Sequence, residues 1–181
     1  WTWEHQALVR ARAVAGDPSL IKRFTELRKA LICQPRDKEK LLTDIVDMRE
    51  KMRAYLDKPT HAAQLVNNVS AQTFNVKQSR GGIVDIEFLV QFIVLANAAT
   101  FSGLADWTDN IRLLESLPVT NVISQSDAQK LIAAYQDYRA TAHLAALKQE
   151  GAELSLKLFS EHREYVKQIW IKVFNSRPAC D

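Results

Sequence analysis

The stretch that decides the fold of this chain is RGGIVDIEFLVQ, residues Arg80–Gln91. Two adjacent glycines end a polar region and open the most apolar segment of the sequence, and Asp85 and Glu87 fall in the first turns of that segment. A carboxylate buried without a partner costs several kcal/mol, so each of these side chains needs an ion-pair partner or a ligand. A glycine pair before a helix also leaves backbone amides that can bind an anion.

The rest of the chain reads as helical scaffold. Apolar residues recur at the spacing of an α-helix, and only five glycines and five prolines interrupt 181 residues. The expected helices cover 2–15, 18–33, 38–56, 82–101, 107–117, 127–148 and 160–175. We therefore predict an all-α domain spanning residues 1–181, a bundle of six or seven helices around a central apolar helix that starts near Gly82. The stretch 57–80 is the least regular, with a short extended segment at Thr73–Lys77.

Helix boundaries are indicated by residues that cap helices. Gly16-Asp17-Pro18 ends one helix and begins the next, because Asp accepts hydrogen bonds from the first free amides and Pro suits the first helical position. The residues expected to begin the later helices are Asp37, then Asp106 or Thr108, then Ser126 or Asp127.

Composition restricts the class of protein. The net charge of +3 is far below the basic balance of a nucleic-acid-binding protein, so no nucleic-acid partner is expected. The two cysteines, Cys33 and Cys180, have no metal-ligand spacing, which suits a reducing, cytoplasmic compartment. No signal peptide is visible, and no apolar run is long enough to cross a bilayer, so no membrane association is expected. Because amphipathic helix begins at Trp1 without a lead-in, we expect a fragment of a longer protein.

The meaning of Asp85 and Glu87 depends on the local structure. On a strand they would share a face, and Asp-x-Glu would be able to hold one metal ion. On a helix they point roughly 200° apart, so each needs its own partner, and the long apolar segment favours the helix. Two interpretations stay open. The carboxylates form buried ion pairs with arginines such as Arg10, Arg12 or Arg112, or they line a pocket that contacts a nucleotide or a metal.

The glycine pair has two interpretations as well. Flanked by Lys77 and Arg80, the amides of Gly81 and Gly82 would hold a phosphate at the start of the helix. Alternatively, the pair is a tight turn between solvated cations. It lacks the full glycine pattern of a nucleotide-binding loop. No zinc motif and no Ser/His/Asp set is present, so no metal site is predicted from the residues.

Three blocks in this order and spacing resemble bacterial glutamine synthetase adenylyltransferase: Trp1–Arg12, Arg80–Gln91 and Trp107–Leu114. The resemblance covers essentially the whole chain. That family has two homologous halves, each a nucleotidyltransferase lobe followed by a helical domain. The residues of the first block resemble those of the family's C-terminal half, which adenylylates glutamine synthetase. A related helical domain occurs in the uridylyltransferase that modifies the PII signal protein.

The resemblance implies what this chain lacks. The family's catalytic lobe carries a Gly-Ser signature followed by Asp-x-Asp carboxylates, which hold the metal ions that activate ATP. This sequence contains neither pattern. It therefore resembles the helical domain that follows the lobe, with no catalytic residue of its own and no activity expected alone. ATP and Mg²⁺ would serve the parent enzyme, and none is expected on the fragment.

The resemblance also implies partners and a role. The partners would be glutamine synthetase, a PII-type signal protein and the upstream nucleotidyltransferase lobe. We expect Lys77, Arg80 and the Gly81-Gly82 amides to face the nucleotide cleft and help to bind the leaving pyrophosphate. The alternative is a non-catalytic module that docks glutamine synthetase or the PII-type protein, with the glycine block serving only the fold.

Overall fold

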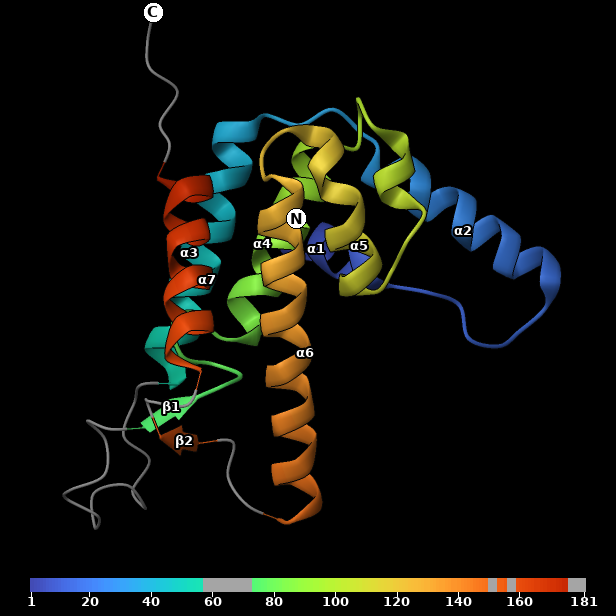
Figure 1. Cartoon of the computed structure of the whole chain (residues 1–181). Helices are drawn as coiled ribbons and strands as arrows, with labels where there is room; N and C mark the ends of the chain where they lie inside the picture. Colours follow the sequence, from blue (N-terminus) through green and yellow to red (C-terminus); the bar gives the residue numbers. More distant parts are fainter. Residues whose placement is uncertain (57–72, 150–152, 156–158, 176–181) are drawn as a thin grey trace, which may run out of the picture. The chain divides into compact units, whose positions relative to one another are not determined.

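The structure is a computed structural model that describes residues 1–56, 73–149, 153–155 and 159–175 (Figure 1). Within these ranges it contains seven α-helices, so the predicted all-α bundle is confirmed. The helices are α1 (Thr2–Arg10), α2 (Pro18–Ile32), α3 (Lys38–Leu56), α4 (Ile83–Asn97), α5 (Asn110–Ser116), α6 (Gln125–Leu147) and α7 (Ser160–Phe174). Short 3₁₀ turns, η2 (Ser102–Ala105) and η3 (Leu117–Thr120), flank α5.

A small antiparallel ribbon is the exception to the helical pattern. The strand β1 (Thr73–Asn75) pairs with β2 (Glu153–Ser155), with Phe74 opposite Leu154. β1 lies within the extended segment predicted at Thr73–Lys77, and the chain turns at Val76. The remainder of the predicted irregular stretch, residues 57–72, lies outside the described residues.

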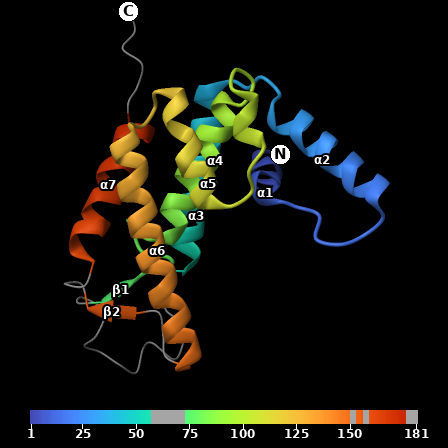
Figure 2. The same cartoon turned by 45° about the vertical axis from the view of Figure 1, so that its right-hand side comes forward.

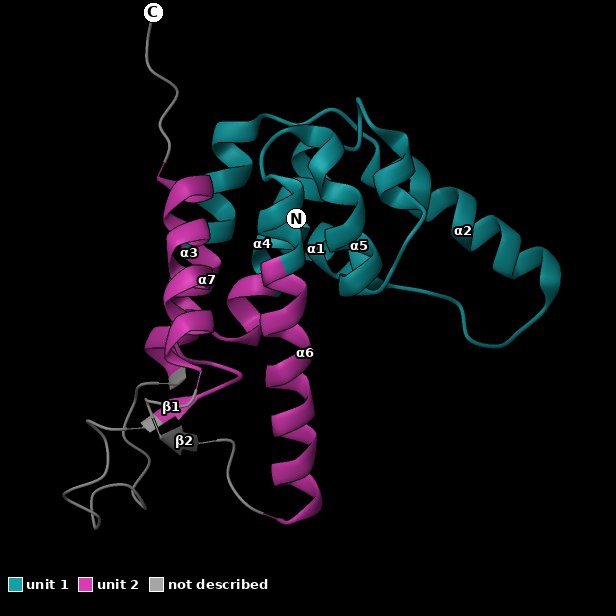
Figure 3. Ribbon diagram, viewed as in Figure 1, with its two compact units in different colours: residues 1–46, 87–129 teal, residues 47–86, 130–181 magenta. Residues whose placement is uncertain are grey.

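The chain forms two compact units (Figure 3). Unit 1 consists of residues 1–46 and 87–129, and unit 2 of residues 47–86 and 130–181. α3, α4 and α6 each contribute residues to both units. The single domain expected from the sequence stays a prediction.

α4 is the apolar helix that the sequence predicted. It begins at Ile83, one residue after the predicted start, and is buried along almost its whole length, with only Glu87, Gln91 and Ala96 partly exposed. A helix that is apolar on every side is stable only inside a core, which is why this segment supplies core residues to both units.

Two predicted caps are confirmed. The Asp17 carboxylate accepts hydrogen bonds from the amides of Ser19 (2.8 Å) and Leu20 (3.3 Å), and Pro18 occupies the first turn of α2. Asp37 caps α3 in the same way, through the amides at residues 39 and 40. Capping depends on residues that are neighbours in sequence, so the sequence alone locates it well.

Two other caps lie near their predicted positions but on different residues. Asp109, rather than Asp106 or Thr108, caps α5 by accepting from an amide at 2.9 Å. α6 begins with a reciprocal pair, in which the Ser124 hydroxyl accepts from the Asp127 amide (3.0 Å) and the Asp127 carboxylate accepts from the Ser124 amide (2.9 Å). Ser124 is therefore the cap, and Asp127 is its partner one turn later.

The first helix ends at Arg10, earlier than predicted, and the backbone at Ala11 is extended (φ −71°, ψ 136°). The cause is a tertiary contact. The Arg28 guanidinium of α2 donates to the carbonyls of Leu8 (2.8 Å) and Val9 (2.6 Å), which belong to the last turn of α1. Because these carbonyls already have charged donors, the helix has no need of a further turn to satisfy them.

Candidate functional site

Asp85 and Glu87 lie on α4, so the helical interpretation of this pair is confirmed and a shared metal site on a strand is excluded. The two carboxylates have separate partners. Asp85 belongs to unit 2 and Glu87 to unit 1, and each organises its own polar cluster.

The Asp85 cluster comprises Asp85, Arg49, Arg53 and Gly81, all in unit 2. One carboxylate oxygen, Oδ1, accepts from Arg49 Nε (2.7 Å) and from Arg53 Nη2 (2.6 Å), and Oδ2 accepts from the Gly81 amide (2.7 Å). The Asp85 side chain is 3% exposed and that of Arg49 is fully buried. Burial lowers the pKa of the Arg49 guanidinium, and the Asp85 carboxylate opposes that shift. The cluster joins α3 to the first turn of α4.

Arg49 and Arg53 were not predicted as the partners of Asp85, although the sequence contains a pattern that indicates their burial. They continue the i, i+4 column of Leu41 and Ile45 on α3, and all four side chains are buried. A cation in the apolar column of a helix needs a buried anion, and Asp85 is that anion.

The two glycines are required by close packing. Gly81 has φ +83°, and a Cβ there would lie 2.6 Å from the carbonyl oxygen of Arg163 on α7. A Cβ on Gly82 would lie 2.6 Å from the carbonyl oxygen of Val76. Any larger residue at either position would push against backbone, so the pair has a structural reason that involves no ligand.

The amides from Gly81 to Val84 already donate within the turn. The Gly81 amide bonds to Asp85, the Gly82 amide to the carbonyl of Ser79 (2.9 Å), and the next two to the carbonyls of residues 76 and 77 (2.8 and 3.2 Å). An anion at this end of α4 would therefore depend on side chains. Lys77 is exposed, and Arg80 is 62% exposed on its side chain, with Nη2 3.1 Å from a Glu50 oxygen.

The Glu87 cluster comprises Gln6, Arg10, Glu87, Gln91 and Asn110, all in unit 1. Glu87 Oε1 accepts from Arg10 Nη1 (2.6 Å) and Asn110 Nδ2 (3.2 Å), and Gln6 Nε2 donates to Gln91 Oε1 (2.9 Å). The members come from α1, α4 and α5, so the three sequence blocks meet here. Arg10 and Glu87 keep 33% and 22% of their side chains exposed. Of the two clusters, only the Glu87 cluster contains an ion pair whose two side chains are both partly exposed to solvent.

Three arginines were named from the sequence as carboxylate partners. The structure brings Arg10 to Glu87, while Asp85 is held by Arg49 and Arg53 instead. Arg112 lies over the ring of Trp107, 5.0 Å from its centroid. Arg12 lies beyond the end of α1 and is exposed.

Among the described residues, no three His, Cys, Asp or Glu side chains gather in a way that would hold a metal ion. No helix in the same part of the chain is both long and apolar enough to span a bilayer.

Comparison with known proteins shows two kinds of similarity. A family model described as GlnD PII-uridylyltransferase matches residues 47–169. Proteins called "Bifunctional glutamine synthetase adenylyltransferase/adenylyl-removing enzyme" match nearly the whole chain. The one from Hahella chejuensis is 46% identical over 96% of this chain and 18% of its own length. Those from Methylococcus capsulatus and Pseudomonas aeruginosa are 41% and 43% identical over 97% and 94% of the chain. The chain spans less than a fifth of the length of these relatives.

Proposed function

Since this chain belongs to the GlnD PII-uridylyltransferase family, we propose that it is a helical domain of an enzyme that transfers AMP from ATP to a tyrosine of glutamine synthetase. The observation that carries the proposal is the identity of 41–46% to relatives of that name over 94–99% of the chain. The resemblance to glutamine synthetase adenylyltransferases is thereby confirmed. The assignment to the C-terminal, adenylylating half stays a prediction.

The chemistry of AMP transfer is assigned to a nucleotidyltransferase lobe outside these residues. An in-line displacement at phosphorus needs carboxylates that hold metal ions and cations that hold the leaving pyrophosphate. The carboxylates here do not fit Mg²⁺, because both oxygens of Asp85 accept from arginines or an amide and Glu87 accepts from Arg10 and Asn110. ATP and Mg²⁺ would therefore bind to the lobe, and neither Asp85 nor Glu87 would take part in a metal-dependent step.

The reaction is tested with the intact polypeptide that carries these residues. Incubation with ATP and glutamine synthetase should produce adenylylated glutamine synthetase, detected as a mass increase on a tyrosine-containing peptide. The parallel incubation uses UTP and a PII-type protein, the reaction that the name of the matching family model suggests. Uridylylation of the PII-type protein without adenylylation of glutamine synthetase would refute the proposal.

The finer role of the chain is to complete the nucleotide cleft through Lys77 and Arg80. Gly81 and Gly82 would shape the turn that presents these two cations, since their amides already donate within it. Arg80→Glu in the intact polypeptide should lower AMP transfer at least tenfold, whereas loss of the exposed ion pair with Glu50 should change the melting temperature only slightly. Lys51→Glu, which reverses another exposed cation of unit 2, is the matched control. Full activity of the Arg80 variant would refute the cleft role.

A docking role is the second candidate, and the burial of the glycine block favours it. Gly81 packs against the α7 backbone, and the start of α4 is held by the Asp85 cluster. The block then serves the fold, and the exposed surface would bind glutamine synthetase or a PII-type protein. Separate binding measurements on the Arg80→Glu polypeptide distinguish the two roles. Loss of ATP binding with glutamine synthetase binding intact supports the cleft, and intact ATP binding supports docking.

A further inference from the structure

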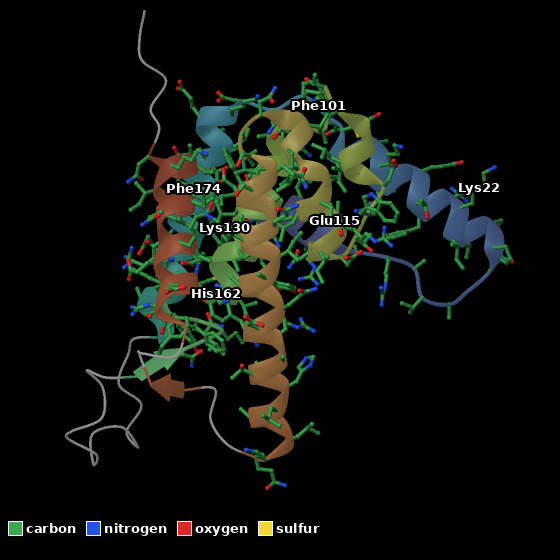
Figure 4. The ribbon with its side chains drawn as sticks, in the orientation of Figure 1. Lys22, Phe101, Glu115, Lys130, His162 and Phe174 are labelled. Carbon is green, nitrogen blue, oxygen red and sulfur yellow. The ribbon has the colours of Figure 1, made fainter. Side chains whose placement is uncertain are left out.

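A second arginine of unit 2 lies against the turn that carries Arg80. Arg163, on α7, donates from Nε to the carbonyl oxygen of Arg80 (3.2 Å), and its Cζ lies 5.2 Å from the centroid of the Phe74 ring on β1. Figures 1 and 2 both show the N-terminal end of α7 beside β1, and Figure 4 labels His162, the residue before Arg163, at that end. The guanidinium of Arg163 is therefore held next to Arg80 by two contacts that involve no carboxylate.

Gly81 allows this approach and brings a third cation with it. A Cβ at position 81 would lie 2.9 Å from Cγ of Arg163 and 3.2 Å from Cγ of Lys167, which follows one turn later on α7. The side chains of Arg163 and Lys167 thus start beside the residue that follows Arg80. Like charges on neighbouring side chains repel one another, and a bound anion relieves that repulsion.

The carboxylates nearby leave much of this charge available. Arg80 lies 3.1 Å from a Glu50 oxygen and Lys167 lies 2.9 Å from a Glu164 oxygen, but the two glutamate side chains are 45% and 57% exposed. Exposed ion pairs contribute little stability, so a more highly charged anion displaces these carboxylates at small cost. Among the described residues, Arg163 has no carboxylate partner.

The remaining donors of the Arg163 guanidinium suit a phosphate group. Nε is used by the Arg80 carbonyl, and no described residue accepts a hydrogen bond from either Nη atom. A guanidinium offers parallel N–H donors that match two oxygens of one phosphate group. The contact with the Phe74 ring holds the side chain in place before a ligand arrives, which lowers the entropic cost of binding. The backbone amides at the start of α4 are already engaged, so side chains would bind an anion here.

We propose that Arg163 binds a diphosphate group together with Lys77 and Arg80. This inference rests on the proposed function, because AMP transfer from ATP releases pyrophosphate and the cleft role assigns that anion to Lys77 and Arg80. A diphosphate concentrates several negative charges in a small volume, which complements a group of cations better than a single carboxylate does. Lys167 adds positive charge to the same surface.

Calorimetric titration of the intact polypeptide with inorganic pyrophosphate tests the contact. Arg163→Gln removes a charge-assisted hydrogen-bond donor and should raise the dissociation constant for pyrophosphate roughly tenfold or more. AMP has no diphosphate group, so its affinity should stay unchanged. An unchanged affinity of Arg163→Gln for pyrophosphate, or an equal loss for pyrophosphate and AMP, would overturn the proposal.

A control and a second variant separate binding from folding. Arg139 also lies over an aromatic ring of unit 2, 5.8 Å from the centroid of Tyr135, so Arg139→Gln should leave both affinities unchanged. Arg163→Lys keeps the charge and the long stem but loses the paired donors. Its affinity for pyrophosphate should fall severalfold while the melting temperature stays unchanged, and full affinity would refute the paired contact.

Further titrations identify the source of the diphosphate. Weaker binding of ATP and pyrophosphate together points to the phosphates of bound ATP, and weaker binding of pyrophosphate alone points to the released product; both results support the site. Weaker binding of glutamine synthetase with both phosphate ligands unaffected would show that Arg163 docks a protein, which overturns the proposal.

The test also separates this inference from the proposed function. AMP transfer by the unchanged polypeptide, alongside full pyrophosphate affinity of Arg163→Gln, removes this inference alone. Pyrophosphate binding that depends on Arg163, without any AMP transfer to glutamine synthetase, removes the proposed function and leaves the anion site.

Discussion

Removing the Asp85 carboxylate should destabilise the start of α4 far more than removing the neighbouring Glu87 carboxylate. Asp85→Ala leaves Arg49 and Arg53 buried without their shared anion, and breaking a buried pair in this way costs about 3–5 kcal/mol. Arg49 keeps the carbonyl of Gln78 (2.7 Å) and Arg53 keeps Glu50, so the lower end, about 3 kcal/mol, applies.

The assay is hydrogen exchange of α3 and α4 peptides in the intact polypeptide. At about 1.4 kcal/mol per tenfold, a loss of about 3 kcal/mol speeds exchange of the protected amides by roughly a hundredfold. Glu87→Ala is the matched control. Its ion pair with Arg10 is partly exposed, so it should cost about 1 kcal/mol or less. Equal acceleration in the two variants would refute the conclusion that the Asp85 cluster is the stronger anchor.

Two more variants probe packing in unit 2. Gly81→Ala should cost about 1–3 kcal/mol, because φ is +83° and the new Cβ would meet the Arg163 carbonyl; Gly103→Ala, where φ is not positive and the nearest atom would lie 3.8 Å from the Cβ, should cost less in hydrogen exchange of the surrounding peptides. Burial raises the pKa of the Tyr138 phenol, so unfolded protein holds fewer protons than folded protein above about pH 10, and stability falls as pH rises there. Tyr138→Phe should reduce that loss in urea unfolding at high pH, and it should be close to neutral at pH 7 because the buried hydroxyl has no hydrogen-bond partner among the described residues.

The start of α4 was predicted from neighbouring residues alone. The glycine pair and the apolar run after it predicted a helix near Gly82, and α4 begins at Ile83. The separation of Asp85 and Glu87 also follows from helical geometry alone. At α5 and α6, several polar residues compete within one turn, and Asp109 and Ser124 cap these helices although neighbours had been predicted. Propensity does not resolve which of several adjacent oxygens meets the free amides.

The sequence did not predict which charged side chains pair with one another between distant segments. The sequence showed that Asp85 needs a cation, but the chain offers many, and the two that reach it lie 36 and 32 residues away on α3. The end of α1 likewise depends on Arg28, 20 residues after the carbonyl that it binds. Such contacts depend on how helices pack, and packing combines small preferences from many residues that no local pattern records.

The sequence by itself determined the all-α class, the apolar helix after the glycine pair, the caps at Asp17 and Asp37, and the family resemblance. Each depends on residues within a few positions of one another, or on the residues of short sequence blocks. Only the tertiary structure decided that the Gly81 and Gly82 amides are already engaged and that Leu20 and Leu27 of α2 stay exposed. Whether a donor or an apolar face has a partner depends on what lies across from it in space.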